Sequence, residues 1–350
     1  MNKKVVVEGV KKPYDVIIGE DVLRVIPDKI KELSKANNIA IITDDNVDKL
    51  YSKNLLEMLK NAGFNAIKFV FSHGENHKSM ATVCDILEFL AENNVTRSDL
   101  IIALGGGIVG DVSGYVASSY LRGIDFIQVP TTFLAAIDSS VGGKTGVNLK
   151  AGKNLAGAFY QPRLVVCDIK TFDTLPKENF KEGMAEAIKY GAICDRELFN
   201  ILSSKEEWDI KSVIERCVKI KAEIVSQDEF DKGKRQLLNF GHTIGHAIER
   251  ATSFEISHGI AVGIGMAIIS KISDDLKWSK EDTYSQIVKC LNNNQIPTST
   301  DIKAEELLSV MIKDKKINGD TINLVVPEEI GNCVLKNIKV LELKEVLKCM

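Results

Sequence analysis

The chain has 350 residues, of which 45% are hydrophobic and 27% are charged, and its formal net charge is −3. This length fits two domains that can each bury a core. The small net charge gives no basic field for nucleic acid, and no apolar run reaches the length that spans a membrane. The seven cysteines, an odd number without C-x-x-C spacing, are typical of free thiols, so we expect a cytoplasmic protein.

The first half of the chain alternates short β-branched segments with segments that have apolar residues at helical spacing. The strands that we expect are 5–7, 16–18, 39–43, 67–71, 100–104 and 126–129. Two helical patterns, 45–61 and 78–93, lie between them. This alternation predicts a mostly parallel, Rossmann-like sheet with helices on both faces.

From about residue 175 the β-branched segments stop and helical patterns dominate. We expect helices at 182–190, 211–226, 237–252, 261–276, 281–292, 304–313 and 343–348. One short strand is expected at 322–326. The sequence thus predicts an α/β N-terminal domain over residues 1–175 and an all-α C-terminal domain over residues 176–350.

The segment GGGIVGD follows an expected strand and precedes an expected helix. Its glycines Gly105, Gly107 and Gly110 satisfy G-x-G-x-x-G, which lets backbone amides approach a pyrophosphate at a helix N-terminus. The signal is weaker than in a standard Rossmann unit, because it does not follow the first strand. Asp44, at the end of another strand, is a candidate partner for a ribose diol, although a helix N-cap explains it at least as well.

The next segment, residues 129–154, is rich in small polar residues, lysine and glycine. Such a composition suits a phosphate-binding loop. The polar residues are Thr131, Thr132, Asp138, Ser139, Ser140, Lys144, Lys153 and Asn154. A solvated turn is also glycine-rich, but it rarely carries TT, DSS and GGKTG so close together. We therefore favour ligand binding here.

Three of the five histidines lie between residues 242 and 258. His242 and His246 are four apart, which places both on one face of a helix. A pair of satisfied core histidines explains this spacing as well as a functional site does, and the third histidine, His258, favours function. Glu186 with His242 and His258 would give two nitrogens and one carboxylate, which suits a catalytic Zn²⁺. His246 would then remain for proton transfer.

Glu182, Glu186 and Lys189 share one face of an expected helix. Such spacing is ordinarily interpreted as a row of ion pairs on a solvent-exposed face. Here, however, the surrounding positions are apolar, so little of this helix surface is polar. Other polar groups suited to an anionic substrate are Lys221, Arg235, Asn239, Lys315 and Lys316. By themselves, the last two would be surface lysines.

Together these motifs resemble those of the 3-dehydroquinate synthase family of sugar-phosphate cyclases. The resemblance runs in order through GGGIVGD, VPTT, GGKTGVN, KEGMAEAIKYG, KAEIVSQDE, LLNFGHTIGHAIE, SHG and DKK. No single motif is specific, but the set is. It implies conversion of 3-deoxy-D-arabino-heptulosonate 7-phosphate to 3-dehydroquinate and phosphate, in the shikimate pathway. The family reaction uses transient oxidation by NAD, phosphate elimination, re-reduction and intramolecular aldol closure.

The resemblance also implies roles for individual residues. The Zn²⁺ ligands, for which Co²⁺ is an alternative ion, would be Glu186, His242 and His258. NAD would contact Asp44, Glu75, Lys78, Gly106, Gly107, Ile108, Asp111, Thr131, Thr132, Lys153, Thr171 and Thr174. The sugar-phosphate substrate would contact Arg122, Asp138, Lys144, Asn154, Glu182, Lys189, Lys221, Arg235, Asn239, His246, Lys315 and Lys316. The residues with catalytic roles would be Lys144, Asn154, Asp231 and His246.

Arg122 corresponds to a family residue that reaches the phosphate from the partner subunit, so a homodimer is implied. The chain departs from the family pattern at two positions. Asp231 stands where the family often has glutamate, which weakens any proton-acceptor role there. Ile260 replaces the carboxylate of the usual HGE after the third histidine and alters the surroundings of the metal.

Three other functions are weighed against this one. Another sugar-phosphate cyclase, such as a 2-deoxy-scyllo-inosose synthase, would use the same cofactors, but Arg235 with Lys221 favours a substrate carboxylate, which that enzyme's substrate lacks. A metal-dependent polyol dehydrogenase of the glycerol-dehydrogenase kind would produce net NADH. A non-catalytic NAD-binding protein would have no use for a complete metal-ligand set.

Overall fold

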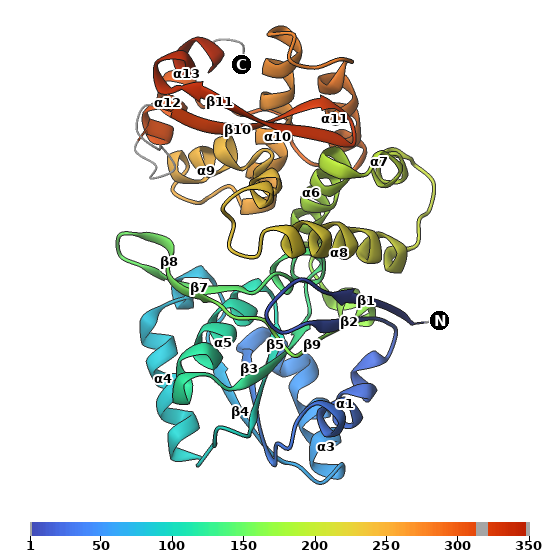
Figure 1. Ribbon diagram of the computed structural model, residues 1–350, viewed down its shortest axis with the longest axis vertical. Coiled ribbons are helices and arrows are strands. Elements are labelled where there is room, and N and C mark those ends of the chain that lie inside the picture. Colours follow the sequence, from blue (N-terminus) through green and yellow to red (C-terminus); the bar gives the residue numbers. More distant parts are fainter. Residues whose placement is uncertain (1, 313–320, 348–350) are drawn as a thin grey trace. The chain divides into compact units, whose positions relative to one another are not determined.

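The computed structural model describes residues 2–312 and 321–347 of the chain (Figure 1). These residues form two compact units, the first made of Met1–Pro176 with Ile210–Phe230 and the second of Lys177–Asp209 with Asp231–Met350. The division differs from the expected boundary at residue 175 in one segment. Helix α8 (Ile210–Gln227) belongs to the first unit, because it packs against strand β1 (Lys3–Val7) and against the turn at Ala135–Ser139.

The first unit contains a seven-stranded sheet with the order β1-β2-β9-β6-β5-β3-β4. Only β1 is antiparallel to its neighbour, and all other pairs are parallel. The remaining strands are β2 (Tyr14–Gly19), β3 (Asn38–Asp44), β4 (Asn65–Phe71), β5 (Leu100–Gly105), β6 (Asp125–Pro130) and β9 (Leu164–Asp168). The six expected strands are confirmed. Strand β9, an apolar run like that of β5, was not expected.

Helices cover both faces of this sheet. They are α1 (Ile26–Leu33), α2 (Asp45–Val47), α3 (Lys53–Asn61), α4 (Met80–Glu92) and α5 (Gly107–Ser119), with the shorter helical turns η1 (Val22–Val25), η2 (Asp48–Ser52), η3 (Glu75–His77), η4 (Tyr120–Arg122), η5 (Ala135–Ser139) and η6 (Ile169–Thr174). Strand β3 shows how the layers form: Ile39 and Ile41 pack toward α1 and α3, while Ala40 and Ile42 pack toward α4 and α5. Alternation of side chains across a strand produces two apolar cores, one on each face.

A separate antiparallel pair follows η5 in the first unit. Strand β7 (Lys144–Leu149) pairs with β8 (Gly152–Phe159), and β7 packs on α5. The segment expected as a phosphate-binding loop is therefore partly a β-hairpin. Lys144 and Lys153 lie on its strands, while Asp138 and Ser139 lie on η5.

The second unit is mainly helical. Its helices are α6 (Lys177–Cys194), α7 (Arg196–Ser203), η7 (Lys234–Asn239), α9 (His242–Ala251), α10 (His258–Asp275), α11 (Thr283–Asn293), α12 (Ala304–Ile312) and α13 (Val340–Leu347). None of the described helices has the length and hydropathy that crossing a membrane requires. The expected helix at 237–252 is interrupted, because Gly241 adopts a left-handed backbone (φ +76°) between η7 and α9.

The second unit also contains one antiparallel strand pair, which corrects the expectation of an all-α domain. Strand β10 (Thr321–Glu329) includes the expected strand at 322–326 and pairs with β11 (Asn332–Lys339). Strand β11 was missed because polar residues interrupt its short apolar positions.

Helices α9 and α10 approach each other so closely that side chains are excluded between them. A Cβ atom on Gly265 would lie 2.1 Å from the carbonyl oxygen of Gly241, and one on Gly245 would lie 3.0 Å from that of Ala261. The start of α10 meets α6 in the same way, since a Cβ on Gly259 would lie 2.5 Å from Cα of Glu182. These glycines let α10 pack closely against both α9 and α6.

We predict that Gly265→Ala lowers the free energy of unfolding of the second unit by about 1–3 kcal/mol, because its methyl group meets backbone that has no rotamer to change. Gly263→Ala, on the same helix, meets a side-chain methyl of Ile296 at 2.7 Å. Ile296 is buried and β-branched, so its shift has a cost, but a side chain adjusts more readily than backbone does. Alanine also gains about 1 kcal/mol of helix propensity over glycine, so the second substitution should cost less. Urea unfolding of both variants tests this, and equal losses would contradict it.

Candidate functional site

Glu186, His242 and His258 come together in the second unit, as the sequence predicts. The Nε2 atoms of His242 and His258 lie 3.5 Å and 3.7 Å from Oε1 of Glu186. Their potential ligand atoms all lie within 4.8 Å of one another. Ligands placed about 2.0–2.1 Å from a tetrahedral Zn²⁺ are separated by roughly 3.3 Å, so a small adjustment would bring these atoms into coordination.

The hydrogen bonds of the two histidines determine which ring nitrogens face Glu186 as acceptors. Nδ1 of His242 lies 3.1 Å from the carbonyl oxygen of Phe240, and Nδ1 of His258 lies 3.1 Å from Oε2 of Glu249. Each partner is an acceptor, so each Nδ1 carries a proton, and a ring that is not also protonated at Nε2 presents a lone pair there. Two nitrogen lone pairs then point at a carboxylate oxygen, an arrangement that a cation stabilises.

The carboxylate of Glu186 supports the same interpretation. Its side chain is buried, and Oε1 accepts no hydrogen bond from any described residue. Its Oε2 pairs with the ammonium of Lys189, one turn further along α6. A buried carboxylate oxygen that faces two lone pairs fits a divalent cation well.

The two histidines differ in their affinity for a proton. Burial lowers the pKa of His242 well below its ordinary value, so this ring is neutral and ready to bind a metal. For His258 burial acts in the same direction, but the hydrogen bond to Glu249 and the charge of Glu186 outweigh it and raise the pKa. Either a proton or a metal cation can therefore satisfy the acceptors around His258.

The second unit also contains other residues for which the sequence predicts a role in the site. The ring of His246 lies 5.5 Å from that of His242 and 5.7 Å from that of His258, measured between centroids. Arg235, which is buried, and Asn239 are both on η7. Asp231 has a left-handed backbone (φ +58°) shortly before η7. Glu182 packs its backbone against Gly259, while Lys315 and Lys316 lie outside the described residues.

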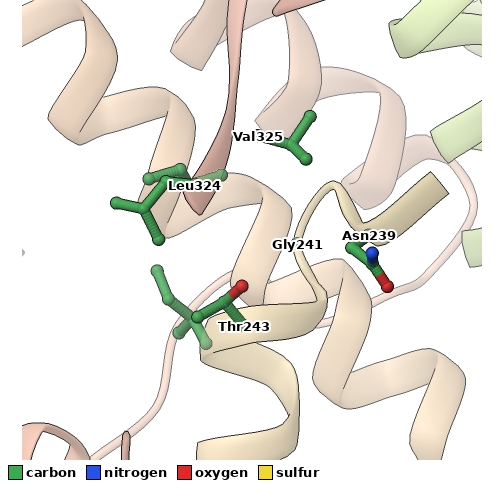
Figure 2. A pocket seen from close by; sticks show the side chains of 7 residues that line it. Asn239, Gly241, Thr243, Leu324 and Val325 are labelled. Atoms are coloured by element: carbon green, nitrogen blue, oxygen red, sulfur yellow. The ribbon is translucent and has the colours of Figure 1, made fainter. Parts of the chain in front are cut away.

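A small pocket lies beside Asn239 in the second unit. Figure 2 shows that Asn239 and Thr243 come from the segments on either side of Gly241, with Leu324 and Val325 of β10 beside them. The lining is mostly apolar and includes none of the three convergent residues. This pocket therefore does not define the metal site.

In the first unit, glycines allow close packing at the carboxyl ends of β5 and β6. Gly106 is the N-cap of α5, where a Cβ would lie 3.0 Å from the methyl group of Thr132, and a Cβ on Gly107 would lie 3.0 Å from Oγ of Ser139. The glycines bring Thr132 and Ser139 close to the N-terminus of α5, the part of a helix at which phosphate groups bind. Asp44 accepts hydrogen bonds from the amides of Asn46 and Val47, so the N-cap interpretation of this residue is correct.

Lys78 connects helix α5 with strand β8, and both elements carry residues that are expected to bind the cofactor or the substrate. Its Nζ lies 2.6 Å from Oδ2 of Asp111 on α5 and 2.5 Å from Oδ1 of Asn154 on β8. Burial raises the pKa of Asp111, and the charge of Lys78 opposes that shift. Glu75 lies close by, since its Oε1 accepts a hydrogen bond from Asn148 on β7 at 2.7 Å. These contacts fix Asn154, whose backbone is left-handed (φ +55°).

A second buried lysine in the first unit pairs with an expected substrate residue. Nζ of Lys221 on α8 donates to the carbonyl oxygen of Asp138 at 2.6 Å and also pairs with its carboxylate. This contact ties α8 to η5 and explains in part why α8 packs with the first unit.

Sequence reasoning missed two polar residues. The hydroxyl of Tyr51 lies 3.2 Å from the carbonyl oxygen of Thr171 and also contacts Oγ1 of Thr174. No sequence signal connects positions more than a hundred residues apart.

The second residue that was missed, Glu249, could have been found from the sequence. It follows His242 by seven residues and His246 by three, so it lies on the same face of α9 as both histidines.

Three further expected residues lie at the surface or on the hairpin. Lys144 is exposed at the start of β7, and Lys153 is on β8. Arg122 is exposed and left-handed (φ +68°) in the turn that follows α5.

The fold and the site thus define a protein with a mostly parallel α/β sheet and a helical unit in which Glu186, His242 and His258 could hold a metal ion. Two family models match the chain in succession: 3-dehydroquinate synthase N-terminal over residues 68–182, and 3-dehydroquinate synthase C-terminal over residues 183–317. The 3-dehydroquinate synthase of Clostridium acetobutylicum is 42% identical over 333 residues, which covers 93% of this chain and 94% of that protein. The chain belongs to the 3-dehydroquinate synthase family.

Two solved structures share this fold along nearly their whole length. A 2-deoxy-scyllo-inosose synthase complexed with carbaglucose-6-phosphate, NAD⁺ and Co²⁺ matches with a TM-score of 0.88 and 27% identity over 99% of both chains. A 2-epi-5-epi-valiolone synthase from Streptomyces hygroscopicus with NAD⁺ and Zn²⁺ bound matches with a TM-score of 0.86 and 25% identity over 96% of both chains.

We predict that Lys78→Met destabilises the first unit by roughly 1–3 kcal/mol in the absence of NAD, because it leaves the carboxylate of Asp111 without its cation. The double variant Lys78→Met, Asp111→Asn should recover part of that loss. Lys60→Met, on the exposed surface of α3, is the control and should change the free energy by less than about 0.5 kcal/mol. If urea unfolding gives Lys78→Met and Lys60→Met the same stability, the pair has no structural role.

Proposed function

We propose that the protein catalyses the 3-dehydroquinate synthase reaction. This reaction converts 3-deoxy-D-arabino-heptulosonate 7-phosphate to 3-dehydroquinate and phosphate in the shikimate pathway, and it is a phosphate-eliminating carbon–oxygen lyase reaction. The observation that carries the proposal is the convergence of Glu186, His242 and His258 in a chain that matches such synthases over almost its full length. Identity is higher to these synthases than to the inosose and valiolone synthases of known structure.

We propose that Glu186, His242 and His258 hold a Zn²⁺ or Co²⁺ ion and that the domain of residues 1–175 binds NAD. Related structures hold NAD⁺ with Co²⁺ or with Zn²⁺. When bound, the metal and NAD together supply polarisation of a substrate hydroxyl and reversible oxidation of its carbon. The proposed NAD contacts are Asp44, Glu75, Lys78, Gly106, Gly107, Ile108, Asp111, Thr131, Thr132, Lys153, Thr171 and Thr174.

The proposed substrate residues supply cations and amides for a sugar acid phosphate, together with two carboxylates and an imidazole. In the first unit they are Arg122, Asp138, Lys144, Asn154 and Lys221, and in the second they are Glu182, Lys189, Arg235, Asn239, His246, Lys315 and Lys316. The planar guanidinium of Arg235 suits bidentate contact with a carboxylate. Burial strengthens such a contact, since little water competes for the charges.

The elimination step needs a proton acceptor and stabilisation of the departing phosphate. We propose that Lys144, Asn154, Asn239 and His246 hold the phosphate and stabilise its developing charge. The phosphate itself takes the proton from the carbon next to the oxidised centre. His246 lies beside both metal-binding histidines, which suits it to exchange a proton with the departing group. Asp231 is proposed to assist proton transfer.

We also propose that the protein is a homodimer in the cytoplasm. Arg122 is exposed, and both Arg122 and the preceding Leu121 have a left-handed backbone. Such a backbone persists where surrounding structure fixes it, and functional residues are frequent there. A fixed, exposed arginine is well suited to reach a phosphate bound by a second copy of the chain. The cytoplasmic location rests on the cysteine composition.

We predict that the protein releases many phosphates from 3-deoxy-D-arabino-heptulosonate 7-phosphate per NAD⁺ molecule, without accumulating NADH. Metal chelation, and the substitution Glu186→Gln, should each lower this rate by at least about 100-fold. Glu178→Gln, at an exposed position of the same helix, is the matched control and should leave the rate unchanged.

Different results would identify other functions. Stoichiometric NADH without phosphate release would indicate a polyol dehydrogenase. Phosphate release from a hexose phosphate but not from the heptulosonate would indicate another cyclase. A chain that binds NAD and catalyses neither reaction would be a binding protein.

A further inference from the structure

Helix α9 carries a buried carboxylate that none of the roles described above uses. Glu249 is 4% exposed, and its Oε2 lies 3.1 Å from Nδ1 of His258. Burying a carboxylate is costly unless a hydrogen-bond donor or a positive charge compensates it. Among the described residues, the carboxylates within 4 Å of His258 are those of Glu186 and Glu249, and they lie on opposite nitrogens of the ring.

The two metal-binding histidines are oriented by different acceptors. His242 donates from Nδ1 to a backbone carbonyl, that of Phe240, whereas His258 donates to a carboxylate side chain. An acceptor at Nδ1 fixes the proton there and leaves Nε2 free to bind metal. A carboxylate acceptor also increases the electron density of the ring, which strengthens its bond to a metal ion.

A second set of residues, His246, Glu249 and His258, is also close enough to hold a metal. Both sets require His258, and a neutral imidazole has only one nitrogen lone pair, so they exclude each other. The rings of His246 and His258 are stacked, with 28° between their planes, which makes it harder for lone pairs lying in those planes to meet at one ion. The rings of His242 and His258 meet at 65°, which allows their lone pairs to converge.

We propose that Glu249 is a positioning residue that holds His258 in the Nδ1-protonated form and directs its Nε2 to the metal, and is not itself a metal ligand. The inference rests on the proposed function in so far as it needs a metal on Glu186, His242 and His258. The carboxylate acts through His258 and does not touch the substrate.

The test measures metal binding directly, without turnover. The full-length chain, stripped of metal, is titrated with Zn²⁺ against a chromophoric chelator, and the Co²⁺-loaded protein gives a visible absorption spectrum of the metal site. Proton–nitrogen NMR of the metal-free protein reports which nitrogen of His258 carries the proton. The variants are Glu249→Leu, which removes the acceptor, and Glu249→Gln, which keeps a neutral acceptor. Ile248→Val controls for weaker packing of the same helix, because Ile248 is a buried apolar residue.

We expect Glu249→Leu to weaken Zn²⁺ binding about 10- to 100-fold, to change the Co²⁺ spectrum and to lose the Nδ1-protonated form of His258. Glu249→Gln should recover much of the affinity. Ile248→Val should lower the melting temperature without changing Zn²⁺ affinity. If wild type binds Zn²⁺ and Glu249→Leu binds it equally tightly, the positioning role is wrong while the metal site stands. If wild type does not bind Zn²⁺, both the metal site and this inference fail.

Discussion

The buried carboxylate of Glu186 is the constraint around which the second unit is organised. An ionised carboxylate in the protein interior costs several kcal/mol unless opposite charge compensates it, and here two imidazole lone pairs face the same oxygen. Lys189 neutralises one side, and a divalent cation would neutralise the other. The glycines between α6, α9 and α10 serve this arrangement, because larger residues would separate the helices that carry the three side chains.

In the first unit, the corresponding constraint is that several short polar segments are held in place at the carboxyl ends of parallel strands. Two buried lysines contribute most clearly. Lys78 joins helix α5 to the β7–β8 hairpin, and Lys221 joins α8 to η5. Each ion pair is short and partly shielded from water, so it holds its segments more firmly than an exposed pair would. Pre-organised groups of this kind lower the cost of ordering a bound ligand.

The sequence predicted the sheet, most helices and the convergence of Glu186, His242 and His258, because each depends on local periodicity or on a short motif. The i, i+4 histidines identified a helix face, and the third histidine with a carboxylate in an apolar helix completed the set. What could not be predicted depends on contacts between distant residues. Examples are the partners of Lys78 and the packing of α8 against β1. Glu249 is an intermediate case, since its position on the histidine face was visible but its partner was not.

The account depends most directly on where the metal binds. X-ray diffraction from crystals soaked in Zn²⁺, recorded on both sides of the zinc absorption edge, would locate the ion without reference to activity. We expect one anomalous peak, bound by a carboxylate oxygen of Glu186 and by Nε2 of His242 and of His258. A peak among His246, Glu249 and Nδ1 of His258, or no peak near these residues, would contradict the account.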